Sequence, residues 1–364
     1  MNSKSIYVTQ SFLPPLEEYT ARIKEIWESG QLTNQGKNVV ELEQKLQKHL
    51  GVNHFFAVSN GTVALQVAFK ALDLKGDVLT TPFSYVATVS SLVWEGLNPV
   101  FVDIKQDDLC IDPAKIEAAI TENTSAILAT HVYGFPCDVE AIEKIANKHG
   151  LKVIYDAAHA FGVTVNGKSV LEYGDISTLS FHATKIFHSG EGGAITTPHK
   201  EVAHNISYMR NFGHNGPEAF FGVGINAKMS ELHGAMGLSV FPYMDKIIAH
   251  RKQATEQYNG LLGALSQISI VKASIPSKHN YSYYPILFKT EEALLHTVQQ
   301  LNAENIFPRR YFYPSLAKLP YVIPQEVPIA GNASSRVLCL PLSSEITRVE
   351  VDRIATIIQN SFNK

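Results

Sequence analysis

Residues 138–156, DVEAIEKIANKHGLKVIYD, place a helix pattern, a glycine stop and a strand pattern in direct succession. In Asp138–His149 the apolar residues recur at helical spacing, and Gly150 follows where helices commonly end. Lys152–Asp156 is then a short apolar run that ends on a carboxylate. The same alternation continues through most of the chain, and this pattern predicts an α/β fold.

The flanking segments repeat the alternation on both sides. Strands are expected at His54–Val58, Asp77–Thr80, Pro99–Asp103, Ser125–Thr130, Thr178–Phe181 and Gly193–Thr196, and helices at Val39–Leu50, Val86–Trp94 and Pro113–Ile120. After about Ile247 the pattern changes to a long helix, His250–Leu262, followed by Tyr283–Phe288 as strand and by Glu291–Glu304 and Arg348–Phe362 as helices. We therefore expect a large domain at 1–247, including an N-terminal segment, and a smaller C-terminal α+β domain at 248–364.

Composition excludes several classes of protein. The 364 residues are 45% hydrophobic and 18% charged, typical of a globular chain. A net charge of −3 without a Lys/Arg-rich run gives no general attraction to nucleic acid or anionic membranes. There is no basic segment followed by an apolar run at the N-terminus, and no stretch approaches the roughly 20 apolar residues that span a bilayer. Cys110, Cys137 and Cys339 lack the spacing of a disulfide framework or zinc site, so we expect a soluble, cytoplasmic protein without metal.

The first candidate site is Ser59–Ala64, SNGTVA. Gly61 permits a tight turn, and the helix expected near Thr62 would offer unpaired N–H groups and a positive dipole end to a phosphate. The alternative is an ordinary helix cap, because Asn and Thr commonly precede helices.

The second candidate follows a predicted strand at Pro82–Thr88, PFSYVAT. Tyr85 could place its ring on a flat heteroaromatic cofactor, although a partly buried core aromatic is an equally good interpretation.

The third candidate, Ile154–His159, delivers Asp156 from a strand end with His159 three residues later. A carboxylate paired with a pyridine nitrogen keeps that nitrogen protonated, as pyridoxal phosphate requires when it accepts electrons. His159 could then bind the phenolic oxygen of that cofactor. Asp156 could instead cap the next helix.

The fourth candidate is Lys185 in Ser180–Gly193, SFHATKIFHSGEGG. A lysine out of bulk water and near a cationic ring loses proton affinity and becomes a nucleophile that forms an imine. A solvated surface lysine is the ordinary interpretation, and only the other three sites argue against it.

Taken together, these motifs resemble the fold type I, aspartate-aminotransferase-like enzymes that act on nucleotide sugars, the DegT/DnrJ/StrS family. The resemblance spans nearly the whole chain through Leu32–Gly36, Asn60–Thr62, Thr80–Phe83, Pro99–Asp103, His131–Gly134, Asp156–His159, Ser180–Lys185, Asn226–Glu231 and Pro308–Pro314. It implies a large domain with a mostly parallel sheet flanked by helices, and pyridoxal 5'-phosphate (PLP), alternating with pyridoxamine phosphate (PMP), held as a Schiff base on Lys185.

The resemblance also implies individual roles. Gly61, Thr62 and Ser180 would hold the cofactor phosphate, and Asn226 would reach the phosphate of a neighbouring subunit, so the active sites of a homodimer would be shared. His159 stands where many relatives have glutamine, and both side chains can donate to the phenolic oxygen. A related branch of dehydratases has histidine in place of the lysine, so Lys185 points to transamination.

The substrate implied by the resemblance is a nucleotide-linked keto-sugar, with glutamate as amino donor. The motifs are similar to those of enzymes that aminate C4 of dTDP-4-keto-6-deoxyglucose to dTDP-4-amino-4,6-dideoxyglucose for O-antigen or polysaccharide biosynthesis; amination at C3 of a related sugar is the alternative. Candidate substrate contacts are His182, His188, Arg310, Tyr311 and Tyr313, with Phe312 as a further candidate. The aromatic cluster could equally pack between the domains. The glycine-rich stretch 216–224 is either a mobile loop at the site or a surface turn.

Two other classes remain open at this level. A non-catalytic PLP-binding sensor or regulator could share the fold, but it could dispense with the lysine, the ring-nitrogen carboxylate or the C-terminal segment, and all three are present. A fold type I enzyme acting on an amino acid, similar to glycine hydroxymethyltransferase or a decarboxylase, would need an arginine for the α-carboxylate. Arg310 could serve that purpose.

Overall fold

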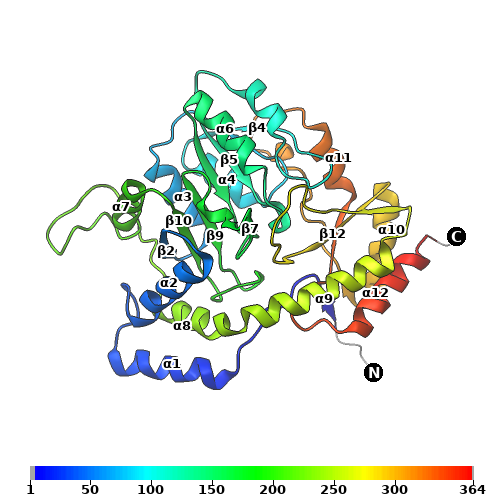
Figure 1. The fold of residues 1–364 in the computed structure, drawn as a ribbon, viewed down its shortest axis with the longest axis horizontal. Helices are drawn as coiled ribbons and strands as arrows, with labels where there is room; N and C mark the ends of the chain where they lie inside the picture. The colour runs from blue at the N-terminus through cyan, green and yellow to red at the C-terminus, as the bar shows by residue number, and fades with distance from the viewer. Residues whose placement is uncertain (1–4, 363–364) are drawn as a thin grey trace.

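The computed structural model describes residues 5–362, and a seven-stranded sheet forms its centre (Figure 1). In spatial order its strands are β2 (His54–Val58), β10 (Gly193–Thr197), β9 (Ile176–Ser180), β6 (Lys152–Asp156), β5 (Thr124–Thr130), β3 (Asp77–Thr80) and β4 (Asn98–Phe101). Strands β9, β6, β5, β3 and β4 pair in parallel, whereas β10 is antiparallel to both neighbours. The expected mostly parallel α/β architecture is confirmed.

Helices cover both faces of the sheet because its strands are apolar on both sides. On β6, Ile154 packs in one core cluster with α3 (Gly61–Ala71) and α7 (Lys200–Met209). Val153 and Tyr155 point to the opposite face and pack with α2 (Lys37–Leu50) and α6 (Val139–His149). Alternate residues of one strand thus enter two separate cores, as the two-residue period of a strand requires. The remaining helices of this part are α1 (Leu16–Ser29), α4 (Val86–Trp94), α5 (Pro113–Ile116) and α8 (Glu231–Val240), and β7 (Thr164–Val165) pairs with β8 (Lys168–Ser169).

A smaller α+β unit follows, built on an antiparallel sheet. Its strands are β11 (Ile268–Ile270), β12 (Tyr284–Phe288) and β14 (Val337–Leu340), and its helices are α10 (Glu291–Ala303), α11 (Pro328–Arg336) and α12 (Arg348–Asn360). The long helix α9 (Met244–Leu262) joins the two parts (Figure 1). The predicted boundary at 247/248 falls inside α9 and stays a prediction. Near the N-terminus, β1 (Ile6–Tyr7) pairs with β13 (Ile306–Phe307) of the C-terminal part.

Four helices have no counterpart among the sequence predictions: α1, α7, α8 and α11. Helix α8, ELHGAMGLSV, buries residues on almost every side, so it has no polar face to reveal its period. The predicted helix Pro113–Ile120 is only partly right, since α5 ends at Ile116 and a 3₁₀ turn follows. The other predicted elements are present, with ends that differ by a few residues.

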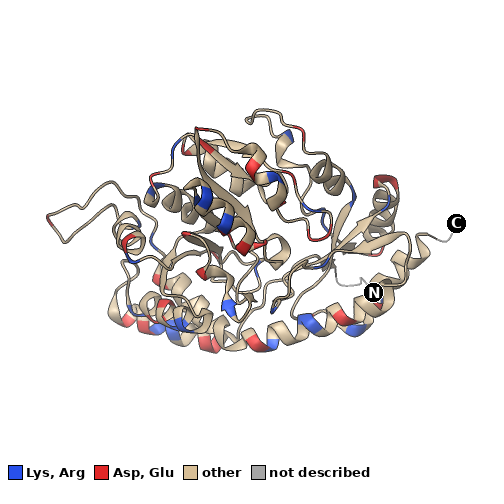
Figure 2. Ribbon diagram, turned by 45° about the horizontal axis from the view of Figure 1, so that its top comes forward, with Lys and Arg blue, Asp and Glu red and all other residues tan. Residues whose placement is uncertain are grey.

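Residues 5–362 carry charged side chains of both signs. Acidic and basic residues are interspersed over the helices (Figure 2). Within the same residues no helix is long and apolar enough to cross a membrane, and no group of three or more His, Cys, Asp and Glu side chains could hold a metal ion.

Candidate active site

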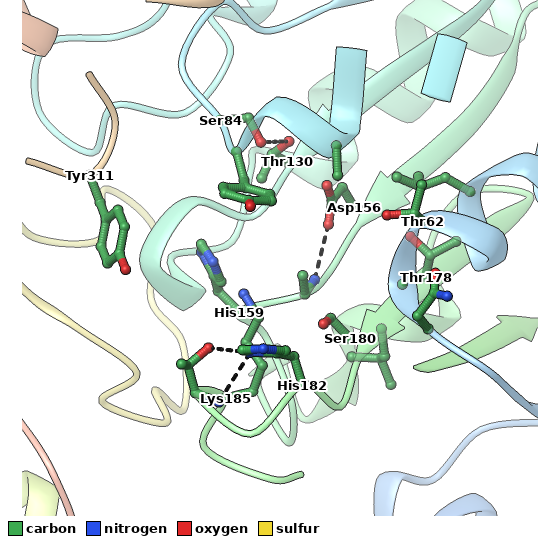
Figure 3. Close-up of a pocket in the computed structure, with 18 of the residues that line it drawn as sticks. Thr62, Ser84, Thr130, Asp156, His159, Thr178, Ser180, His182, Lys185 and Tyr311 are labelled. Atoms are coloured by element: carbon green, nitrogen blue, oxygen red, sulfur yellow. Dashed lines mark hydrogen bonds between the residues drawn. The ribbon is translucent and has the colours of Figure 1, made fainter. Parts of the chain in front are cut away.

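A cavity of about 310 Å³ opens where the parallel strands β6 and β9 end. Ligands of open α/β sheets bind at the carboxyl ends of the strands. Figure 3 shows Asp156, His159, Ser180, His182 and Lys185 around this cavity. Tyr85 and the Asn60–Thr62 turn also line it, so residues from all four sequence motifs meet around one small space.

Lys185 reaches the cavity from the turn between β9 and β10. Backbone hydrogen bonds from Ala183 N to Gly190 O and from Lys185 N to His182 O, both 2.8 Å, fix this turn. Desolvation lowers the pKa of the Lys185 ammonium from 10.5 to about 8, while the negative charge of Asp156 acts in the opposite direction. About a tenth of the amine is therefore uncharged at pH 7, far more than in an ordinary lysine, and the uncharged form is the one that acts as nucleophile or base.

Asp156 ends β6 with its carboxylate almost fully buried, at 7% exposure. Its Oδ1 accepts from Ala158 N at 3.1 Å and its Oδ2 accepts from Thr88 Oγ1 at 2.7 Å. The alternative role as the cap of a following helix is wrong, because residues 157–163 form turns. The carboxylate instead faces the cavity from the end of a central strand (Figure 3).

A chain of hydroxyl groups behind Asp156 has a defined direction. Thr88 donates its proton to Asp156, so Ser84 must be the donor in its 2.7 Å hydrogen bond with Thr88, and Thr130 donates to Ser84 at 3.0 Å. Each hydroxyl in the chain thus donates a hydrogen bond to the next, and the last one, that of Thr88, donates to the charged carboxylate. Sequence reasoning missed this chain. Ser84 and Thr88 lie four residues apart around the start of α4, a spacing that could have suggested that their side chains are neighbours.

The phosphate end of the cavity is formed where α3 begins. The Asn60 side chain caps the helix by accepting from Val63 N at 2.9 Å, so the capping interpretation is correct for this residue. Gly61 and Thr62 are the first two residues of α3, in the turn whose backbone N–H groups lack intrahelical partners. A Cβ on Gly61 would lie only 3.0 Å from Ser180 Cβ. Glycine is therefore needed for close approach of α3 to β9, rather than for an unusual backbone conformation.

His159 is buried and held in one tautomer. Its Nδ1 accepts a hydrogen bond from Tyr133 N at 3.2 Å, so the ring proton of the neutral imidazole is on Nε2. Burial, with a smaller contribution from the Lys185 charge, holds the pKa of His159 well below its usual range. A neutral Nε2–H donor is the equivalent of a glutamine amide at this position. The backbone carbonyl of His159 accepts hydrogen bonds from Asn280 Nδ2 and Ser282 Oγ, both at 2.8 Å.

The remaining walls of the cavity are aromatic and more open. Tyr85, Tyr311 and Phe312 line it, as does Tyr283, which sequence reasoning missed. Tyr85 is 57% exposed, so a buried core role for this ring is wrong. His182 lines the cavity beside Glu191, with 3.8 Å between His182 Nε2 and Glu191 Oε1. Glu191 also escaped sequence reasoning, because an acidic residue in a glycine-rich turn carries no distinctive local pattern.

Four predicted site residues do not line this cavity. His188 is buried and its Nε2 donates to Phe12 O at 2.7 Å. Arg310 donates to Glu291 Oε1 at 2.6 Å and to Ser335 O at 2.9 Å, and its guanidinium lies 3.6 Å from the centre of the Tyr313 ring. Tyr313 faces a neighbouring cleft, and Asn226 is exposed at the base of a loop. None of the described lining residues of the cavity is an arginine, which disfavours the interpretation of Arg310 as an α-carboxylate receptor.

The residues present fit PLP. Lys185 can bind a carbonyl carbon, Asp156 can pair with a ring nitrogen, His159 can donate to a phenolic oxygen, and Gly61 with Ser180 forms a narrow cradle beside a helix N-terminus. This donor set and the mostly parallel sheet define a fold type I PLP-dependent enzyme.

Comparison with known proteins makes the assignment specific. The model of the DegT/DnrJ/EryC1/StrS aminotransferase family matches residues 16–359. A dTDP-4-amino-4,6-dideoxy-D-glucose transaminase from Shigella dysenteriae is 46% identical over 362 residues, 98% of this chain and 99% of the relative. One of the same name from Escherichia coli is 41% identical over 367 residues, with the same coverage. The crystal structure of DesI in the presence of its TDP-sugar product has a TM-score of 0.93 at 31% identity, covering 98% of this chain and 93% of that one.

The chain belongs to the DegT/DnrJ/EryC1/StrS aminotransferase family. It is a PLP-dependent sugar aminotransferase, and the alternatives of a non-catalytic sensor and of an amino-acid-specific enzyme are thereby excluded.

Proposed function

We propose that this enzyme transfers the amino group of glutamate to the C4 ketone of dTDP-4-keto-6-deoxyglucose and forms dTDP-4-amino-4,6-dideoxyglucose. The observation that carries the proposal is the placement of Lys185, Asp156 and His159 around one cavity, in a chain 46% and 41% identical to two transaminases named for this product. Amination of a C3 ketone is the competing outcome.

When bound, PLP supplies an electron sink next to the carbon whose proton is moved. Lys185 Nζ would hold the cofactor until an amino donor displaces it. The freed amine would then be the base that accepts and returns the proton of the substrate carbon. With a pKa of about 8, Lys185 can accept and return this proton near neutral pH, whereas an ordinary lysine would stay protonated.

Asp156 and His159 prepare the site for this transfer without moving. Asp156 would hold a proton on the cofactor ring nitrogen, and the hydroxyl chain from Thr130 through Thr88 keeps its carboxylate oriented. His159 Nε2–H would donate to the phenolic oxygen. Since both side chains are buried and their positions are fixed by hydrogen bonds, little reorganisation is needed during the reaction.

The identity of the reaction can be tested with purified protein. Incubation with glutamate and dTDP-4-keto-6-deoxyglucose should give a product whose NMR spectrum places the amino group at C4. Borohydride treatment before digestion should fix the cofactor mass on the peptide that contains Lys185. An amino group at C3, or no product, would contradict the substrate assignment, and a protein that cannot be loaded with PLP would contradict the cofactor site.

A homodimer with shared active sites is part of the proposal. The loop after α7 projects from the body of the protein (Figure 1), and its aromatic and aliphatic residues are exposed, including Phe220 at 64% and Val223 at 89%. Such a loop suits burial against a second copy. Asn226 lies at its base, exposed and outside its own cavity, where it could reach the phosphate site of a partner.

Complementation tests the shared site directly. Co-expressed Lys185→Ala and Asn226→Ala chains should form hybrid dimers in which one site combines two intact contributions, so activity returns although each variant alone is impaired. Absence of recovery, with hybrid dimers verified by two affinity tags, would contradict sharing. We further propose that the enzyme is cytoplasmic and serves O-antigen or polysaccharide biosynthesis. Three buried cysteines that are all unpaired support the cytoplasmic location, because thiols stay reduced there.

A further inference from the structure

Two of the three buried cysteines form a pair close to the active site. Cys110 and Cys137 are both 0% exposed, and their side chains are hydrogen-bonded to each other. Cys110 Sγ also lies 3.4 Å from Phe135 O, and Cys137 Sγ lies 3.1 Å from Thr130 O, both within hydrogen-bond distance. A disulfide bond joins two sulfurs at about 2.0 Å, so thiols already in contact need only a small movement to be linked.

The pair is connected to the active site through the segment Thr130–Cys137. Thr130 donates the first hydrogen bond of the hydroxyl chain that leads to the ring-nitrogen carboxylate (Figure 3). Tyr133 N, from the middle of the segment, donates to His159 Nδ1 at 3.2 Å and fixes the tautomer of that ring. Two of the groups that would position the cofactor therefore depend on a segment that ends on one of the paired thiols.

The two thiols differ in how easily they lose a proton. Burial acts to raise the pKa of the Cys137 thiol, but its hydrogen bond with Cys110 and the nearby His131 ring lower this pKa to about 6. The same hydrogen bond, together with burial, raises the pKa of the Cys110 thiol well above its usual range. The thiolate is the form that attacks an oxidant, so Cys137 is the nucleophile of the pair and Cys110 is its partner.

Two clefts bring small solutes close to the pair. One, of about 840 Å³, is lined by Leu109, which precedes Cys110 in the chain. The other, of about 240 Å³, is lined by Phe135, whose carbonyl contacts the sulfur of Cys110. A molecule as small as a peroxide can thus approach to within one residue of the thiols, whereas a bulky oxidant cannot contact sulfurs that are fully buried.

We propose that Cys110 and Cys137 form a peroxide-sensitive dithiol, which slows the enzyme when it is oxidised to a disulfide. The Cys137 thiolate attacks one oxygen of hydrogen peroxide, the O–O bond breaks, and the departing hydroxide takes up the proton that Cys137 had lost. Cys137 is then a sulfenic acid. The sulfur of Cys110 attacks it, the S–O bond breaks, and the oxygen leaves as water with the Cys110 proton. One peroxide is reduced to two waters, and two thiols are oxidised to one disulfide.

The disulfide changes the contacts of the segment Thr130–Cys137. Neither sulfur keeps a proton, so Cys137 can no longer donate to the carbonyl of Thr130, nor Cys110 to that of Phe135. A hydrogen bond of this kind accounts for roughly three- to tenfold in an equilibrium or a rate. We therefore expect a loss of activity of this size, and a thiol reductant should restore the rate because thiol exchange reopens the link.

Peptide mass mapping after peroxide treatment tests the link. The holoenzyme is treated with hydrogen peroxide, remaining thiols are blocked in denaturant, and the digest is compared with and without dithiothreitol. A peptide pair that joins Cys110 to Cys137 should appear and should separate on reduction. Cys110→Ser should stop at a sulfenic acid on Cys137, which dimedone labels, and Cys137→Ser should give neither product. Cys339→Ser is the matched control, because it changes the third buried cysteine and should leave the link intact.

Single-turnover absorbance tests the consequence for the enzyme. After removal of peroxide, the parent should convert bound PLP to PMP with glutamate roughly three- to tenfold more slowly than before treatment. Dithiothreitol should restore its rate, and Cys137→Ser, whose hydroxyl can still donate to Thr130, should keep its own untreated rate. This measurement rests on glutamate as the proposed amino donor, whereas the mass mapping is independent of any substrate.

Three results would overturn the proposal. The first is the absence of a linked peptide pair in the treated parent enzyme. The second is a linked enzyme that retains its full rate. The third is an equal loss of rate in the parent and in Cys137→Ser of unchanged melting temperature, because peroxide would then act at another site.

Discussion

The two sides of the cavity differ in how firmly their groups are held. On the inner side, the residues Thr88, Thr130 and Asp156 are buried and joined by directed hydrogen bonds. On the outer side, Tyr85 is 57% exposed. The inner side stabilises charge at fixed positions, whereas the outer side leaves room for a large substrate to enter. Changes on the inner side should therefore lower kcat, and changes on the outer side should raise KM.

The largest effect is expected for Lys185→Ala. Loss of the base should reduce product formation by roughly 10²- to 10⁴-fold or more, because proton transfer by a positioned group contributes about that much. Single-turnover kinetics with the PMP form and the keto-sugar measure the step. A rate within tenfold of the parent enzyme would show that another group moves the proton. Unchanged circular dichroism would verify folding.

Asp156→Asn should reduce kcat by roughly 10²- to 10³-fold with little change in KM, because it removes fixed electrostatic stabilisation of the protonated ring. Thr88→Val leaves the carboxylate in place and removes only its donor, so a loss of about tenfold is expected. Steady-state kinetics with varied keto-sugar separates the two parameters. A larger loss for Thr88→Val than for Asp156→Asn would contradict the order inferred from the structure.

The pKa of Lys185 predicts how fast the apoenzyme takes up PLP. Only the neutral amine attacks a carbonyl carbon, so the rate should rise with pH to a midpoint near 8, rather than near the 10.5 of an ordinary lysine. Because the Asp156 charge raises this pKa, Asp156→Asn should move the midpoint to lower pH. Stopped-flow absorbance between pH 6 and about 10 measures the profile. A midpoint that is unchanged in Asp156→Asn would contradict the electrostatic link.

The smallest effect on chemistry is expected for Asn280→Ala. Asn280 is buried and donates to the carbonyls of His159 and Phe161. Its removal should lower the free energy of unfolding by about 1–3 kcal/mol, because buried acceptors lose their partner. Denaturant titration measures this change, with exposed Asn147→Ala as the control, which should differ by less than about 0.5 kcal/mol. Equal effects of the two variants would show that Asn280 does not hold His159.

Much of the inner side of the cavity could be predicted from short, continuous segments of the sequence. Lys152–Asp156 is an apolar run ending on a carboxylate, and the structure has a central strand with these same ends. The lysine turn, Ser180–Lys185, is also a short continuous segment whose residues lie together because they are adjacent in the chain. Fold class, cofactor and family could be predicted for this reason.

Contacts between distant segments could not be predicted in this way. The carboxylate of Asp156 meets Thr88 across 68 residues, and the His188 ring bonds the carbonyl of Phe12 across 176. Arg310 is paired with Glu291, although the sequence alone predicted that Arg310 binds the diphosphate of the substrate.

The sequence by itself therefore determined the α/β class, the lysine, the ring-nitrogen carboxylate and the family, because each depends on residue types within a short segment or on their order along the chain. Only the tertiary structure decided the tautomer of His159, the direction of the hydroxyl chain and the pairing of Arg310 with Glu291. The physical reason is that a hydrogen bond or ion pair depends on which groups meet in space, and neighbours in the chain can meet entirely different partners.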